Sequence, residues 1–129
     1  MEIKKETIRN TSAIKFTCWE DGECIAGMQL YLIRNDSHTE PYALLEDLFV
    51  KETHRKKGVG SALVKEAREE AKRLNCYKVI GTSRLSREHV HRFYERLGFE
   101  RYGFEFRFNL NENRQLHYKR SRAIKNGRT

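Results

Sequence analysis

Residues 54–63 read His-Arg-Lys-Lys-Gly-Val-Gly-Ser-Ala-Leu, and the rest of the chain is organised around this stretch. It separates a short apolar run, Leu44 to Val50, from a helical pattern that extends from Gly60 to Leu74. Arg55, Gly58 and Gly60 form the pattern R-x-x-G-x-G. Glycines at this spacing let backbone N–H groups turn toward an anion, and the helix adds unpaired amides and the positive end of its dipole. The stretch predicts a diphosphate site, although a tight turn alone would also account for two glycines.

The residues before this stretch predict a meander of antiparallel strands. Apolar residues alternate with polar ones from Ala13 to Trp19, and a second strand is expected from Cys24 to Ile33. Asp21-Gly22 between them is typical of a two-residue hairpin turn. A polar loop, Arg34 to Pro41, leads to a third strand from Tyr42 to Val50.

The residues after it predict a β-α-β unit. In the first helix, apolar residues recur at helical spacing, and these are Leu63, Val64, Ala67, Ala71 and Leu74. Asn75 is a plausible stop, and Tyr77 to Thr82 is the next strand. Because a helix connects the third and fourth strands, we expect them to be parallel neighbours.

A second helix and a last strand are expected toward the C-terminus. Ser86 is placed to cap the helix and Gly98 to end it. Its buried stripe is formed by Val90, Phe93, Tyr94 and Leu97. Aromatic residues then alternate with polar ones from Tyr102 to Leu110, which predicts a half-buried strand. The predicted fold class is α/β, with a mixed, mostly antiparallel twisted sheet of about five to six strands around a central β-α-β unit.

Length and composition restrict the classes of protein to be considered. The chain has 129 residues, enough for one domain with one core. We expect the domain to span residues 1–113 and a basic tail to span 114–129, because the tail carries six of the positive charges and no acid, which leaves +2 of the net +8 for the domain. No apolar run has the length of a membrane span or a signal peptide, and the three cysteines show no C-x-x-C spacing. The chain is expected to be cytoplasmic and metal-free.

Two motifs together resemble the GNAT superfamily of N-acetyltransferases. The first is the order strand, R-x-x-G-x-G, helix, which resembles the acetyl-CoA pyrophosphate loop of that family. The second is Phe93-Tyr94-Glu95-Arg96-Leu97-Gly98-Phe99, which resembles a helix ending in F-Y-x-x-x-G-F. The resemblance covers roughly residues 24–110 and is specific for the superfamily, not for the substrate.

The resemblance implies where acetyl-CoA is bound. In the family, the strand before the glycine loop binds the pantetheine arm through its backbone, and here this part comprises Leu48, Phe49 and Val50. The loop that would hold the pyrophosphate, largely through backbone amides, comprises Arg55, Lys56, Lys57, Gly58, Val59, Gly60 and Ser61. The family tyrosine corresponds to Tyr94, which would protonate the departing thiolate of the coenzyme. The alternative for Tyr94 is a core aromatic residue at helical spacing.

Glu46 is the candidate for the group that accepts the proton of the amine. By strict alternation Leu44, Glu46, Leu48 and Val50 share one face of the third strand, and Asp47 faces the other way. A carboxylate in an apolar run is costly unless it is paired or functional, and burial would raise its pKa toward a value useful for a base. Several family members carry a base or a water-holding side chain at the matching position. A solvated or salt-bridged acid on an open sheet is the alternative, and Asp47 is a weaker candidate.

The resemblance implies transfer of acetyl from acetyl-CoA to a primary amine by direct attack in a ternary complex. A small-molecule amine is favoured over a protein amine because nothing indicates a peptide groove. A non-catalytic module that binds coenzyme A or nucleic acid stays open as an alternative, although the tail has few aromatic residues for nucleic acid. GNAT enzymes usually open with a strand and helices that cover the acceptor site. Too few residues precede Ala13 for such helices, so an open acceptor site, or one completed by a second subunit in a homodimer, is expected.

Overall fold

The computed structural model describes residues 1–111. In chain order its elements are β1 (Ser12–Glu20), β2 (Glu23–Ile33), β3 (Tyr42–Val50), the 3-10 helix η1 (Glu52–His54), α1 (Val59–Arg73), β4 (Val79–Gly81) and α2 (Glu88–Arg96). The strands form one sheet in the order β1-β2-β3-β4. β1, β2 and β3 pair antiparallel, whereas β3 and β4 pair parallel. The mixed sheet and the β-α-β unit predicted from the sequence are therefore confirmed.

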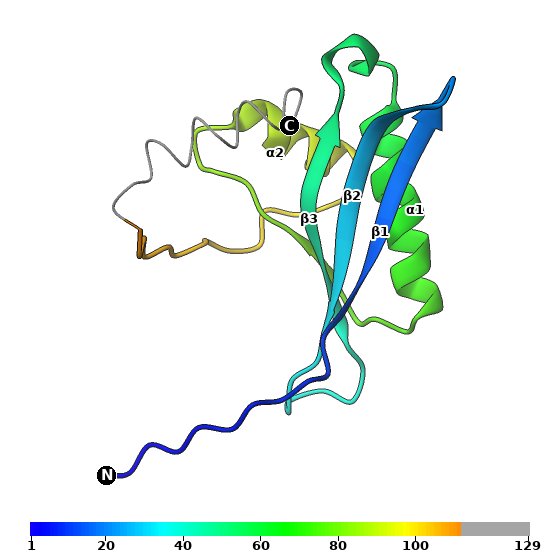
Figure 1. Ribbon diagram of the computed structural model, residues 1–129. Helices are drawn as coiled ribbons and strands as arrows, with labels where there is room; N and C mark the ends of the chain where they lie inside the picture. Colours follow the sequence, from blue (N-terminus) through cyan, green and yellow to red (C-terminus); the bar gives the residue numbers. More distant parts are fainter. Residues whose placement is uncertain (112–129) are drawn as a thin grey trace.

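Both helices lie on the same face of the sheet, behind the three long strands in Figure 1. The core between the sheet and the helices is apolar, since no described polar or charged residue is buried. It comprises Ile25, Ala26, Met28 and Leu30 of β2, Ala43, Leu45 and Val50 of β3, and Leu63, Val64, Ala67 and Ala71 of α1. Half-buried residues of α2, among them Phe93, Tyr94 and Leu97, pack against this core. The other face of the sheet carries no helix in the described part of the chain (Figure 1).

Three short motifs set the ends of the elements as the sequence predicts. Asp21 and Gly22 both have positive φ, 50° and 76°, which is the signature of a type I′ turn between β1 and β2. Asn75, with φ 64°, follows the last turn of α1, and the amide of Cys76 donates to the carbonyl of Ala71. This six-to-one hydrogen bond is the Schellman arrangement that ends helices.

The same arrangement ends α2. Gly98 has φ 92°, and the amide of Phe99 donates to the carbonyl of Tyr94 at 3.0 Å. The ring of Phe99 returns to the ring of Tyr94, with centroids 5.3 Å apart. The helix end therefore fixes Tyr94 through its backbone and through its side chain.

Four expectations about the C-terminal half are wrong. The described sheet has four strands rather than five to six, and β4 covers only Val79–Gly81 rather than 77–82. Ser86 does not cap α2, because Arg87 occupies the N-cap position and no side chain bonds there. Residues 102–110 form no strand and are exposed, since no described strand lies beside them. The basic tail, 114–129, lies outside the described residues, so the division into domain and tail stays a prediction.

Candidate active site

A β-bulge interrupts β3 at Asp47. Glu46 pairs with Gln29 and Phe49 with Gly27, so two residues of β3 stand opposite the single residue Met28. Asp47 has φ 62°, in the left-handed region that Asp tolerates better than most residues. An extra residue on one strand reverses the alternation of side chains beyond it.

The bulge overturns the predicted faces of β3. Glu46 stays on the uncovered face of the sheet, because its partner Gln29 lies there, opposite the core face of Met28 and Leu30. Leu48 and Val50, which were expected beside Glu46, instead pack against the core on the helix face. The alternation fails because the sequence pattern contains no signal for the inserted residue.

β3 and β4 separate immediately before the bulge. Their parallel pairing covers only 43–45 of β3 and 79–81 of β4, and its last pair is Leu45 with Gly81. Beyond this pair, β3 continues to Val50. In the described part of the chain, the β4 side of β3 beyond Leu45 faces no other strand.

Tyr94 lies where the two strands separate. A Cβ built on Gly81 would stand 3.0 Å from the Cε1 and Cζ atoms of Tyr94 and 3.3 Å from its hydroxyl. The absence of a side chain at Gly81 therefore lets the phenol lie against the end of β4. The rings of Phe93 and Phe99 flank it, with centroids 5.2 Å and 5.3 Å away.

The surroundings of Tyr94 keep its phenol protonated. Burial raises the pKa of Tyr94 above its ordinary value of 10, and the nearby charge of Glu46 raises it further. Both effects disfavour the phenolate. The charge of Glu46 therefore acts on Tyr94, and Tyr94 carries its proton at neutral pH.

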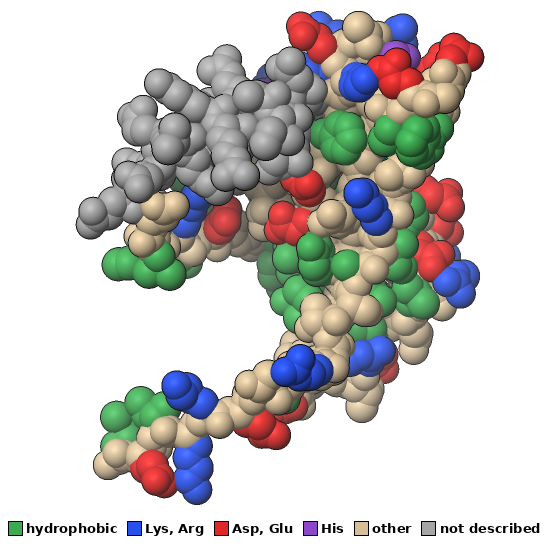
Figure 2. Space-filling model, viewed as in Figure 1, with side chains coloured by type: hydrophobic (Ala, Val, Ile, Leu, Met, Phe, Trp, Pro, Cys, Tyr) green, Lys and Arg blue, Asp and Glu red, His purple; other side chains and the backbone are tan. Residues whose placement is uncertain are grey.

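An open depression of about 390 Å³ lies on the uncovered face of the sheet, beside Glu46. It is lined by Thr11, Gln29, Tyr31, Ile33, Leu44, Glu46 and Asp47. Figure 2 shows apolar and acidic side chains next to each other on this face. One expectation is corrected here, because Asp47 does not face away from Glu46. Glu46 is exposed, which agrees with the alternative of a solvated acid on an open sheet.

The glycine loop presents backbone amides at the start of α1. Gly58, the N-cap, has φ 81°, and no side chain caps the helix. The first amide with a helical partner is that of Ala62, which donates to the carbonyl of Gly58 at 3.0 Å. The amides of residues 59–61 have no partner within the helix, and its first turn contains no acid. This end of α1 has the properties of an anion site.

The two glycines serve different purposes. At Gly58 there is room for a side chain, because a Cβ would meet nothing within 4 Å. Glycine is favoured there by the left-handed backbone conformation instead. A Cβ on Gly60 would point inward, to 3.6 Å from Phe93 and from Val50, which is ordinary van der Waals contact. Because Phe93 also contacts Tyr94, one side chain connects the loop to the phenol.

Arg55 anchors the loop to the sheet. Its Nε donates to the carbonyl of Val50 at 3.1 Å, so part of this guanidinium holds the loop rather than a ligand. His54 approaches Glu20 of β1, with Nε2 3.2 Å from Oε2. Lys56, in the left-handed region at φ 61°, and Lys57 are exposed beside the amides.

Comparisons with known proteins identify the family. The model of the acetyltransferase (GNAT) family matches residues 2–99. The chain belongs to this family. It is 26% identical over 91 residues to an aminoglycoside N(6')-acetyltransferase type 1 of Acinetobacter haemolyticus, a match that covers 68% of this chain and 63% of that protein. The chain thus spans less than two thirds of that relative.

Two solved structures resemble this GNAT domain. One is a putative acetyltransferase from Agrobacterium tumefaciens str. C58, with a TM-score of 0.71 and 32% identity over 75% of this chain and 68% of that one. The other is a Trypanosoma brucei acetyltransferase, with a TM-score of 0.69 and 27% identity over 76% of this chain and 69% of that one. Both likenesses agree with the α/β fold described above.

Residues 1–111 contain no group of three His, Cys, Asp or Glu side chains placed to hold a metal ion, and neither described helix has the length and apolar character that a membrane crossing requires. Cys76 follows α1 at the end away from the glycine loop, and burial raises the pKa of its thiol, which disfavours a nucleophilic thiolate.

Sequence reasoning missed several residues of this GNAT site. The bulge residue Asp47 was assigned to the wrong face, and Gly81, which gives Tyr94 its place, was not singled out. Gln29 and Tyr31, joined by a hydrogen bond from Tyr31 Oη to Gln29 Oε1 at 3.0 Å, line the depression beside Glu46. Alternation along β2 could have placed these two on the uncovered face, but no local signal distinguishes them from other surface residues.

Proposed function

We propose that this protein transfers acetyl from acetyl-CoA to a primary amine of a small molecule, by direct attack in a ternary complex. The observation that carries the proposal is the position of Tyr94, a protonated phenol at the point where β3 and β4 separate. Two further observations support it: the chain belongs to the GNAT family, and the side chain of Phe93 lies between the glycine loop and Tyr94.

Acetyl-CoA is proposed to lie along the β4 side of β3. The loop amides of residues 56–61 would take the pyrophosphate, with the charges of Lys56 and Lys57 beside them. Backbone groups of residues 48–50 would bind the pantetheine arm, because no described strand uses that edge of β3. The thioester would then reach the end of β4, where Tyr94 stands.

The chemistry assigned to the site is an acyl transfer without a covalent enzyme intermediate. The neutral amine attacks the thioester carbonyl carbon, a C–N bond forms, and the C–S bond breaks. The departing thiolate takes a proton from the phenol of Tyr94, which holds its proton at neutral pH. Before the attack, the ammonium form of the acceptor loses one proton to Glu46, directly or through a water molecule, which gives the neutral amine. The second proton, released from nitrogen as the amide forms, returns to the phenolate of Tyr94. Because Glu46 is exposed, we assign it two roles: it accepts the proton, and its negative charge attracts the ammonium form of the acceptor.

The acceptor is proposed to occupy the depression on the uncovered face. Glu46 and Asp47 give it a negative side, whereas Tyr31, Ile33 and Leu44 give it apolar surface. This combination suits a cationic amine with a carbon skeleton. An aminoglycoside acetyltransferase is among the relatives, which supports a small-molecule amine over a protein lysine or N-terminus.

The test is the release of free thiol from acetyl-CoA with a panel of amines that includes aminoglycosides, simple diamines, and lysine peptides. We expect thiol release that depends on the amine, with the acetylated amine found by mass spectrometry. Wild-type protein that binds acetyl-CoA but releases no thiol with any amine would favour the non-catalytic module instead. Release only with peptides would assign the site to a protein amine.

A further inference from the structure

The aromatic segment, residues 102–110, is the largest exposed apolar feature of the described chain. Its apolar residues are 77% to 94% exposed, and they are Tyr102, Phe104, Phe106, Phe108 and Leu110. They alternate with polar residues as in a strand, yet the described sheet ends at β4 and pairs with none of them. A row of unpaired backbone and exposed aromatic side chains is a template for pairing with another strand.

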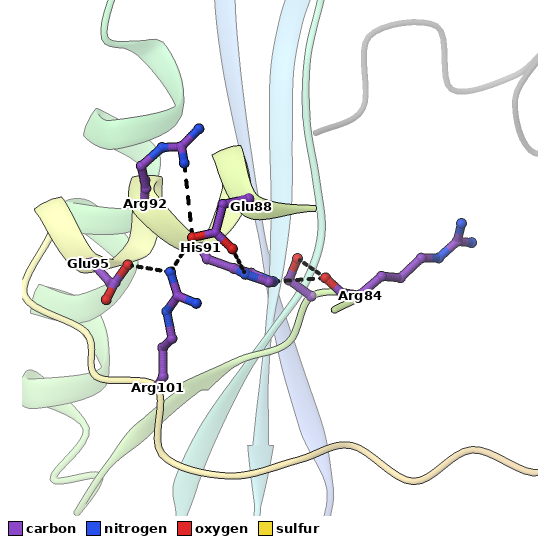
Figure 3. A network of polar contacts seen from close by, with 7 residues as sticks. Arg84, Glu88, His91, Arg92, Glu95 and Arg101 are labelled. Carbon is purple, nitrogen blue, oxygen red and sulfur yellow. Dashed lines mark hydrogen bonds and ion pairs between the residues drawn. The ribbon is translucent and has the colours of Figure 1, made fainter. Parts of the chain in front are cut away.

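An ionic clamp fixes the point from which the aromatic segment leaves the domain. Arg101 Nη2 donates to Glu88 Oε1 at 2.6 Å and to Glu95 Oε1 at 2.9 Å, so the residue before the segment is bound to α2 (Figure 3). The hydrogen bond from Arg101 lowers the pKa of Glu88, and a hydrogen bond with His91 lowers it further, which keeps the clamp charged. From Arg101 the segment runs outward, on the side of β3 away from β1 (Figure 1).

The edge strand of the same chain is a poor partner for the aromatic segment. β4 has three residues, Val79–Gly81, and could form backbone hydrogen bonds with only a third of a nine-residue strand. A second copy of the aromatic segment offers a partner of equal length. The four aromatic side chains alone present roughly 600–1,000 Å² per copy, of which pairing covers the part that faces the partner strand; a standard interface buries ~800 Å² per partner.

We propose that two copies of this chain associate by antiparallel pairing of their aromatic segments, with Phe106 on the two-fold axis. In this register Phe104 of one copy faces Phe108 of the other, and Tyr102 faces Leu110, so aromatic and apolar residues meet across the strands. On the opposite face of the ribbon, Glu105 of each copy faces Arg107 of the other. The interface is isologous and contains two opposite-charge pairs.

The charges specify this register against its neighbours. Sliding one segment by two residues in one direction places Glu105 opposite Glu105, and sliding it in the other places Arg107 opposite Arg107. Like charges directly opposite each other are destabilising. A slip by one residue would place aromatic side chains against polar ones. Only the register centred on Phe106 therefore satisfies both faces of the ribbon.

The test uses sedimentation velocity of the full chain at physiological salt over about 1–100 µM, a range in which weak homodimers dissociate measurably. Wild type is expected to dimerise with a concentration-dependent mass. Glu105→Arg alone and Arg107→Glu alone each replace two attractive pairs by two repulsive ones, and we expect each to weaken dimerisation on the order of tenfold or more. The double variant, which keeps the net charge, is the matched control and is expected to dimerise like wild type.

The decisive sample is an equimolar mixture of the two single variants. In the mixed pair each arginine faces a glutamate, so the mixture is expected to regain the mass of the dimer while each variant alone stays monomeric. At concentrations low enough for wild type to be monomeric, circular dichroism and Tm should match wild type, because the substituted positions lie on the exposed segment. Wild type that stays monomeric throughout, single variants that dimerise unchanged, or a mixture without rescue would each overturn the proposal.

Discussion

The glycine loop allows a sharp comparison of two nearly isosteric substitutions, Gly58→Asn and Gly58→Asp. Gly58 has φ 81°, a conformation that both Asn and Asp tolerate better than other side chains, and a Cβ there meets nothing within 4 Å. The two variants should therefore fold equally well and differ only by one negative charge at the start of α1. That charge lies where the diphosphate is proposed to bind.

The size of the effect follows from linkage and electrostatics. At a hundredfold excess over Kd, acetyl-CoA stabilises the folded state by about 2.7 kcal/mol, which for a domain of this size raises Tm by roughly 10 °C. A carboxylate a few ångströms from the diphosphate costs about 3 kcal/mol at a surface site, enough to raise Kd about a hundredfold. At the same concentration the stabilisation then falls to about 0.4 kcal/mol, a shift of roughly 1–2 °C.

The assay is thermal unfolding with and without acetyl-CoA, supported by calorimetric titration. We expect Gly58→Asn to keep most of the Tm shift and Gly58→Asp to lose nearly all of it, with each shift measured against the variant's own Tm in the absence of ligand. Gly60→Ala is a second control, because its Cβ makes only ordinary contacts and its helical backbone favours Ala. If Gly58→Asp binds acetyl-CoA as tightly as Gly58→Asn, the diphosphate does not lie at this helix end.

Three further predictions concern the chemistry. Glu46→Gln should lower turnover at neutral pH, and its turnover should recover as the pH approaches the pKa of the amine, whereas Asp47→Asn should mainly raise KM. Identical pH–rate profiles for wild type and Glu46→Gln would exclude the role of Glu46 as the base. Gly81→Ala places a Cβ 3.0 Å from Tyr94 and should lower kcat at least tenfold with an unchanged Kd for acetyl-CoA; full kcat would show that the phenol needs no such placement. Cys76→Ser should leave kcat unchanged, and a large loss would reopen a covalent intermediate.

Much of the fold could be predicted because its signals are local. Asp21-Gly22 specifies its turn through two positive φ angles, and Asn75 and Gly98 end their helices in the same backbone conformation. The glycine loop could be located because the strand before it and the helix after it have different periodicities. Each of these features depends on a few neighbouring residues.

The remaining features depend on pairing, which a local pattern does not contain. The bulge at Asp47 reverses the faces of Leu48 and Val50. An apolar run contains no sequence signal for the extra residue of a bulge. The aromatic segment has the alternation of a strand, but alternation specifies a face and not a partner. The apolar neighbours of Glu46 left a buried base and a solvated acid both open, and its exposure follows from the lack of a helix on that face in the described residues.

The most direct test of the account is a single-turnover measurement on Tyr94→Phe. The substitution keeps the ring that packs between Phe93 and Phe99 and removes only the hydroxyl group that carries the proton. With enzyme in excess over acetyl-CoA and a saturating amine, the rate of acetyl transfer should fall on the order of ten- to a thousandfold, while Kd for acetyl-CoA stays nearly unchanged. The wild-type rate should show no loss from phenol ionisation until the pH exceeds 10, because the pKa of Tyr94 is raised. An unchanged rate for Tyr94→Phe would contradict the central claim and leave this tyrosine a packing residue.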